Sequence, residues 1–216
     1  MSKRTPFLAL VALAVGIALV ANVPASKAPQ SEQQQLRQAV HLILAQPRLH
    51  RDLIRKFGPR LTPFLDQELR ARRGANSFYS DLYVSLHGRL SATMQEFLPD
   101  AITDEQRCLN AIRALAYSGP AAAPATHTLI PFLSDARFAP DAAHALASIG
   151  PDAHEAVPAL IAALDDQVPY AATALGNIGR GAVAAIPALT QARSNAVLEG
   201  PGWFRREVEK ALGRIH

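Results

Sequence analysis

A repeat of about 30 residues in the C-terminal half is the feature that most constrains how this chain can fold. Gly119, Gly150 and Gly179 are 31 and 29 residues apart. Each glycine has a leucine four residues before it and another ten residues after it: Leu115, Leu146 and Leu175, then Leu129, Leu160 and Leu189. Because several positions recur in one register, we expect three copies of one structural unit.

Each copy divides into two helical patterns. In the second copy, alanine and leucine recur at helical spacing from Ala143 to Ile149, and Gly150 is expected to end that helix with a positive φ. Asp152 is expected to cap a second helix, whose Pro158 falls in the first turn, where a missing N–H costs little. The apolar stripe of this second helix consists of Val157, Leu160, Ile161 and Leu164. Such short, alanine-rich helices need neighbouring helices to bury their apolar faces.

The copies resemble HEAT repeats, in particular the short alanine-rich HEAT-like repeats of phycobilin lyase subunits and many bacterial proteins. The resemblance rests on residues 111–119, 143–150 and 172–179 and on the Pro-Ala-Leu motifs within 157–160 and 186–189. It implies an all-α fold, a right-handed α-solenoid of helix pairs over residues 103–216. One departure is that prolines open the first helices of copies two and three, where the family has an acidic residue and an arginine. The resemblance implies a fold, and no single activity.

The rest of the chain is also predicted to be helical. The stripe Val208, Ala211, Leu212 and Ile215 indicates a final helix that resembles the first helix of another pair. Residues 35–100 form a helical N-terminal region, with helices expected through Leu36 to Ile43, from Leu49 to Phe57, and around Leu82 to Phe97. Residues 61–69 echo residues 129–134, which favours a degenerate repeat there.

The first 34 residues have the pattern of an export segment. Lys3 and Arg4 precede an uncharged run of 18 residues, Pro6 to Val23. This length fits two alternatives, a signal peptide cleaved after Ala25 or a membrane-spanning anchor. Residues 1–25 are therefore predicted to be a signal peptide or signal-anchor helix, and residues 26–34 a linker into a helix capped at Ser31. Either alternative places the domain in the cell envelope, anchored in the inner membrane through residues 6–23 and facing the periplasm, or periplasmic or secreted after cleavage.

Charge is divided unevenly between the two halves. Residues 47–74 hold eight Lys or Arg against three acidic residues, a net of +5, whereas residues 101–200 hold five against nine, a net of −4. The basic segment can attract an anionic partner or lipid head groups, or it is a solvated helical face. Cys108 is the sole cysteine, so it has no internal disulfide partner, and its apolar neighbours predict a small buried side chain.

Catalytic signatures are missing from the sequence. It has no phosphate-binding loop, nucleophile elbow or zinc-binding pattern. His154-Glu155 resembles the His-Glu pairs by which some HEAT-repeat hydroxylases hold iron, but the equivalent positions in the other copies are Ala123-Pro124 and Val183-Ala184. We therefore expect no metal and no cofactor.

The outward face of the second helices is the expected binding surface. Its candidate residues are Thr128, Asp135, Asp166, Gln191 and Asn195. These side chains form no convergent acid, base or nucleophile, which favours a non-catalytic interaction module with a protein or envelope partner. The alternative is an enzyme or enzyme accessory resembling the HEAT-like lyase subunits. A nucleic-acid partner is not expected, because the clearest repeats are acidic.

Overall fold

The computed structural model describes residues 32–72, 85–86, 88–89, 103–166, 168, 170–198 and 202–215. Within these ranges every regular element is a helix, and no strand occurs. The α-helices are α2 (Glu32–Ala45), α3 (Arg51–Phe57), α4 (Thr62–Arg72), α7 (Asp104–Ser118), α8 (Thr126–Leu129), α9 (Ala139–Ile149), α10 (Val157–Asp165), α11 (Ala171–Ile178), α12 (Ile186–Leu198) and α13 (Gly202–Ile215). The 3-10 helices are η1 (Gly58–Arg60), η2 (Gly119–Ala125), η3 (Ile130–Ser134), η4 (Gly150–Ala156) and η5 (Gly179–Ala185).

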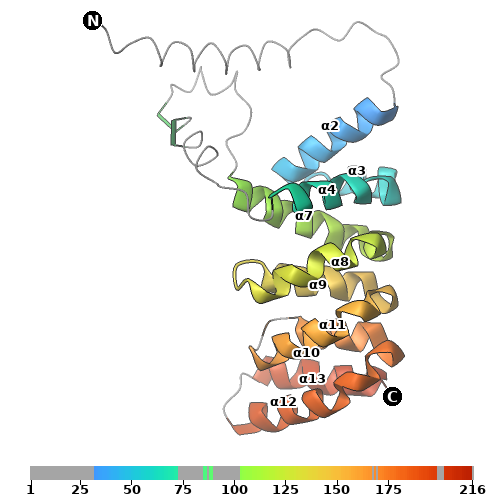
Figure 1. The fold of residues 1–216 in the computed structure, drawn as a ribbon, viewed down its shortest axis with the longest axis vertical. Coiled ribbons are helices and arrows are strands. Elements are labelled where there is room, and N and C mark those ends of the chain that lie inside the picture. The colour runs from blue at the N-terminus through green and yellow to red at the C-terminus, as the bar shows by residue number, and fades with distance from the viewer. Residues whose placement is uncertain are drawn as a thin grey trace, which may run out of the picture.

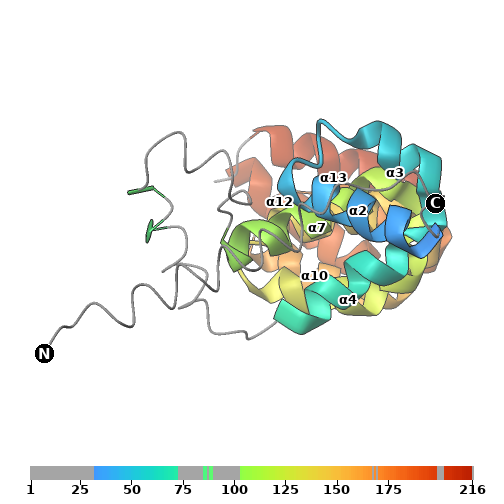
Figure 2. The ribbon, with the colours of Figure 1, turned by 90° about the horizontal axis from the view of Figure 1, so that it is seen from above.

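The helices are stacked in pairs along the long axis of the molecule (Figure 1). The first helices form one layer, in which α7 packs on α9, α9 on α11, and α11 on α13, and α4 packs on α7 at the N-terminal end. The second helices form another layer, in which η3 contacts α10 and α10 contacts α12. Viewed down the stack, the pairs lie over one another, with α2 at the N-terminal end (Figure 2). The prediction of an all-α chain with stacked helix pairs is confirmed for the described residues.

The repeated leucines and alanines form the core. All six leucines that flank the repeat glycines are fully buried, and the alanines between them, such as Ala111, Ala142 and Ala172, are 0–2% exposed. Small side chains let the axes of stacked helices approach closely, so the burial of each helix depends on the next pair.

The repeat glycines adopt a backbone conformation that other residues rarely adopt. Gly119, Gly150 and Gly179 have φ of 59°, 78° and 66° with ψ between −131° and −136°. The predicted positive φ is confirmed, although ψ lies far from the left-handed helical value. This region of the backbone map is essentially restricted to glycine, so the recurring residue follows from the turn itself.

The linkers between paired helices differ from the prediction. Asp152 does not cap α10: it lies exposed on η4, and α10 begins only at Val157, with Ala156 at its N-cap and no side-chain cap. The 3-10 turn itself supplies a backbone hydrogen bond, because the Val157 N–H donates to the carbonyl of His154. Since 3-10 segments satisfy helix ends in this way, no side-chain cap is required.

The N-terminal region also consists of helices packed on the repeats. Leu36, Val40 and Ile43 are buried on α2, as predicted, and Cys108 is buried on α7. The second predicted helix begins at Arg51 instead of Leu49, whose side chain is 70% exposed in the preceding turn. The stripe of the final helix is confirmed, with Val208 and Ile215 at 0% and 2% exposed.

Some predictions fall outside the described residues. These are the export segment of residues 1–25, most of the linker of residues 26–34, and nearly all of the helix predicted around Leu82 to Phe97. Among the helices that the structure describes, none combines the length and the apolar character needed to cross a bilayer.

Candidate functional site

The predicted face of the second helices is only partly exposed. Asp166, Gln191 and Asn195 are exposed, whereas Thr128 is 8% exposed and was wrongly expected to point outward. The equivalent residues Ala159 and Ala188 are half-buried. Thr128, Ala159 and Ala188 each lie directly before the buried leucine of their second helix. The neighbouring helices of the stack therefore cover these residues as well as the leucines.

The Asp135 carboxylate is already engaged by a neighbouring residue. Its Oδ1 accepts from the backbone N–H of Arg137 at 3.1 Å, and its Oδ2 accepts from the Arg137 guanidinium at 2.7 Å. The hydrogen bond from the Arg137 side chain holds the pKa of Asp135 below its ordinary value. The Asp135 carboxylate therefore stabilises the turn that contains Arg137. The residues of the predicted face that remain for a partner are mainly Asp166, Gln191 and Asn195.

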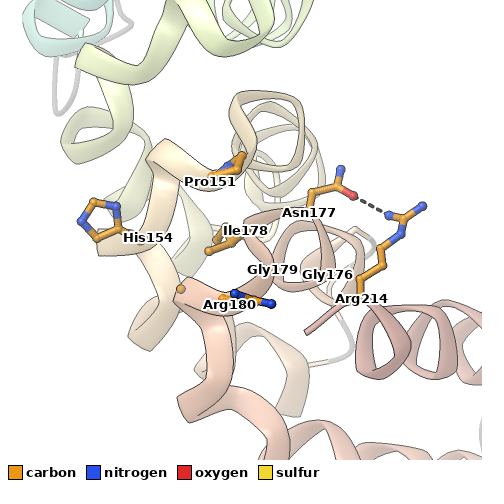
Figure 3. Close-up of a pocket in the computed structure, with 9 residues that line it drawn as sticks. Pro151, His154, Gly176, Asn177, Ile178, Gly179, Arg180 and Arg214 are labelled. Atoms are coloured by element: carbon orange, nitrogen blue, oxygen red, sulfur yellow. Dashed lines mark hydrogen bonds between the residues drawn. The ribbon is translucent and has the colours of Figure 1, made fainter. Parts of the chain in front are cut away.

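A groove lies at the C-terminal end of α11 (Figure 3), and it is a more concave surface than the predicted face of the second helices. It is open to solvent, has a volume of about 760 Å³, and is lined by turns of η4 and η5 and by the end of α13. Its side chains include Pro151, His154, Asn177, Arg180 and Arg214. The groove therefore joins residues of two consecutive repeats and the final helix.

Two glycines allow the close backbone packing at this groove. A Cβ on Gly176 would lie 2.8 Å from the Cα of Ala211, so α11 and α13 could not approach as they do with any other residue there. A Cβ on Gly181 would lie 3.1 Å from Cγ2 of Ile178 and 3.3 Å from Cβ of His154. The backbone contact at Gly176 leaves no room for a Cβ, whereas a Cβ on Gly181 would require neighbouring side chains to move by a few tenths of an ångström.

Asn177 connects the groove to both neighbouring helices. Its Nδ2 donates to the carbonyl of Ala147 near the end of α9 at 2.8 Å, and its Oδ1 accepts a short hydrogen bond from the Arg214 guanidinium. The side chain thereby satisfies a helix-end carbonyl and fixes the position of a cation. Figure 3 shows Asn177 and Arg214 joined on one side of the groove, while the His154 ring points away from it.

The groove is cationic. Arg180 and Arg214 line it, and none of its nine lining residues is acidic. Among the residues that the structure describes, no carboxylate forms an ion pair with Arg180. The groove can therefore bind an anionic group through charge and through guanidinium hydrogen bonds. Sequence analysis missed this site, although Arg180 between two glycines, where the other copies have Gly-Pro, was a signal.

The His154-Glu155 pair does not converge. His154 is exposed, and Glu155 Oε2 instead contacts Nε2 of His127 on α8 at 2.8 Å. Within the described part of the chain, no group of three His, Cys, Asp or Glu side chains is arranged to hold a metal ion. The two side chains of the pair therefore lie in different environments: His154 is exposed to solvent, and Glu155 contacts His127.

No family model matches the chain, and no curated protein or solved structure is significantly similar to it. The class defined by the structure is an all-helical protein of stacked helix pairs with a cationic groove at one edge.

Proposed function

We propose that this chain is a HEAT-like α-solenoid that acts as a non-catalytic interaction module in the cell envelope. The proposal is supported by the repeat of helix, positive-φ glycine, 3-10 turn and second helix, stacked in register over three copies. Repeat architectures of this kind present extended surfaces to partners instead of one enclosed pocket.

The groove at the end of α11 is the observation that carries the proposal. Its open shape suits a segment of a macromolecule, because sites for small molecules usually bury most of the ligand surface. Arg180 and Arg214 favour an acidic segment, and long-range attraction by such charges accelerates association. The partner is therefore a protein that presents an acidic segment to this edge.

Partner capture with a charge-reversal variant tests this role. The full chain, Arg180→Glu and Arg205→Glu are each used to recover partners from detergent-solubilised envelope. Arg205 is the matched control, because it is exposed on α13 and paired with Glu209 at 2.9 Å, outside the groove. We expect one protein to be recovered with the native chain and Arg205→Glu but lost with Arg180→Glu. Equal recovery with both variants would contradict the assignment of the groove.

Export is tested separately. Lys3, Arg4 and the apolar run to Val23 support placement outside the cytoplasm. A reporter that is active only in the periplasm, fused after Ala28, should be active. Activity of a cytoplasmic reporter alone at that position would show that the localisation is wrong while leaving the groove proposal intact.

A further inference from the structure

A second, smaller cavity lies on the layer of first helices. It has a volume of about 220 Å³, is more enclosed than the groove at α11, and lies between the turn that precedes α3 and the helices α7, α9 and α11. The side chains used below are Arg48, Arg113, Tyr117, Asp141, His144 and Tyr170. This cavity brings the basic segment of residues 47–74 against the repeats, a contact that the sequence did not predict.

Two arginines of the basic segment gather at one tyrosine. The Arg51 guanidinium carbon lies 4.3 Å from the centre of the Tyr117 ring. A hydrogen bond from Arg51, with further contributions from its charge and from Arg48, lowers the pKa of the Tyr117 hydroxyl. This wall of the cavity therefore favours negative charge.

A fixed ion pair forms the middle of the cavity. Arg113 on α7 donates from Nε to Oδ1 of Asp141 on α9 at 2.8 Å. Both side chains are partly buried, at 32% and 25% exposed, and they join two consecutive first helices. Two guanidinium groups line the cavity, those of Arg48 and Arg113, against the single carboxylate of Asp141, which leaves one positive charge.

The far wall carries a strained tyrosine. Tyr170, directly before α11, has φ +70° and makes no side-chain capping hydrogen bond. Its ring is 49% exposed and lies 4.9 Å from the His144 ring of the preceding repeat. A non-glycine residue with this φ is uncommon and carries a cost in backbone strain. Neither capping nor deep burial of the ring offsets that cost, so a binding role explains why tyrosine occupies the position.

We propose that this cavity binds a single carboxylate of an acidic peptide, with Arg48 pairing the anion beside Tyr117, and with Tyr170 and His144 flanking its stem. A carboxylate suits the site better than a phosphate, because Asp141 would repel a dianion and Arg113 is already engaged. The small volume admits one side chain of a longer segment. The inference rests on the proposed protein-binding function and gives it a second, separately testable contact.

Peptide titration of the full chain in nonionic detergent tests the proposal. The probe is a fluorescent peptide of five Glu-Ala repeats, capped at both ends, and the control peptide has five Gln-Ala repeats. We expect the acidic peptide to bind and Arg48→Gln to weaken its binding by about tenfold, as expected for one lost charged hydrogen bond. The matched control, Arg193→Gln, removes an exposed charge on α12 and should leave the affinity within about twofold.

Tyr170→Gly separates binding from folding. Glycine tolerates the positive φ, so this variant should melt at the native temperature or above it while binding the acidic peptide at least threefold more weakly. The proposal is overturned if the Gln-Ala peptide binds equally well, or if Arg193→Gln weakens binding as much as Arg48→Gln does. Stronger competition by inorganic phosphate than by acetate, or binding only to anionic phospholipid vesicles, would also overturn it. Partner capture through Arg180 can succeed or fail independently of these results.

Discussion

The helix pair α3–α4 and the helix pair α9–α10 belong to the same stack of helix pairs, but the two helices of each pair are joined differently. Gly58 ends α3 with φ 48° and ψ −128°, and Gly150 ends α9 with φ 78° and ψ −136°. The following 3-10 segment has three residues in the N-terminal pair and seven in the repeat. The turn is thus the same at both places, while the linker length differs. A sequence repeat is visible only where linker length is preserved.

Their cores differ as well. The α9 helix buries mainly alanines against its neighbours, whereas α4 buries Leu65 and Leu69, preceded by the buried Leu61. Large side chains bury more apolar area for each residue, so the N-terminal pair relies on a few leucines. The repeat spreads its burial over many small contacts on both sides.

The largest expected effect comes from truncating a leucine in each pair. Leu160 and Leu65 are both fully buried, so Leu160→Ala and Leu65→Ala should each lower the free energy of unfolding by about 2–5 kcal/mol through lost burial and the cavity left behind. Denaturant unfolding followed by circular dichroism measures this loss. A cost below about 1 kcal/mol for Leu65→Ala alone would mean that α4 does not share the core of the repeats.

A smaller effect is expected from the two glycines. A Cβ added to Gly58 meets nothing within 4 Å, and one added to Gly150 meets only the carbonyl of Asn177 at 3.8 Å. The cost of Gly58→Ala and Gly150→Ala is therefore backbone strain, about 1–3 kcal/mol each. Matched melting curves should show similar losses. A clearly smaller loss at Gly58 would show that the N-terminal turn can change its conformation and the repeat turn cannot.

Asparagines that join neighbouring helices give a third comparison. The Nδ2 of Asn110 on α7 donates to the carbonyls of Leu44 and Ala45, at 2.7 and 3.3 Å, at the end of α2. Asn110 is 4% exposed, so Asn110→Ala should cost about 1–3 kcal/mol by leaving buried carbonyls unpaired. Asn177→Ala should cost less, because water can reach its half-buried site. Urea titration distinguishes the two, and equal costs would contradict the role given to burial.

The sequence predicted the parts of the fold that repeat and missed those that depend on contacts between distant residues. The recurring glycines require a defined turn, and the recurring leucines require a buried stripe. The turn and the stripe could therefore be predicted from residue spacing alone. Gly58 has the same conformation as the repeat glycines but was missed, because its linker is four residues shorter. Thr128 was placed outward because a helical wheel of one element cannot show what the next pair covers.

The candidate site could not be derived from the sequence for the same reason. The groove at α11 needs the close approach of Gly176 to Ala211, residues 35 positions apart. The cavity at Tyr170 needs Arg48 to reach α7, and nothing local predicts that contact. The charge of residues 47–74 indicated an anionic partner, and Arg180 between two glycines was a further signal that the analysis of the repeat did not use.

The smallest expected effect concerns His154 and Glu155. Substituting them distinguishes the hypothesis of a binding surface from that of a metal site. His154 is exposed, so His154→Ala should change the free energy of unfolding by no more than about 0.5 kcal/mol. Glu155→Ala removes only the contact with Nε2 of His127. The two side chains are 46% and 72% exposed, and water solvates the imidazole left behind. Thermal melts with and without added Fe²⁺ measure both effects. If iron raises the melting temperature of the native chain and either substitution abolishes that rise, the pair binds metal and the proposal of a non-catalytic module is wrong. If neither iron nor substitution moves the melt, while Leu160→Ala lowers it strongly, the stability of the repeat resides in its core and its polar edge is left available for partners.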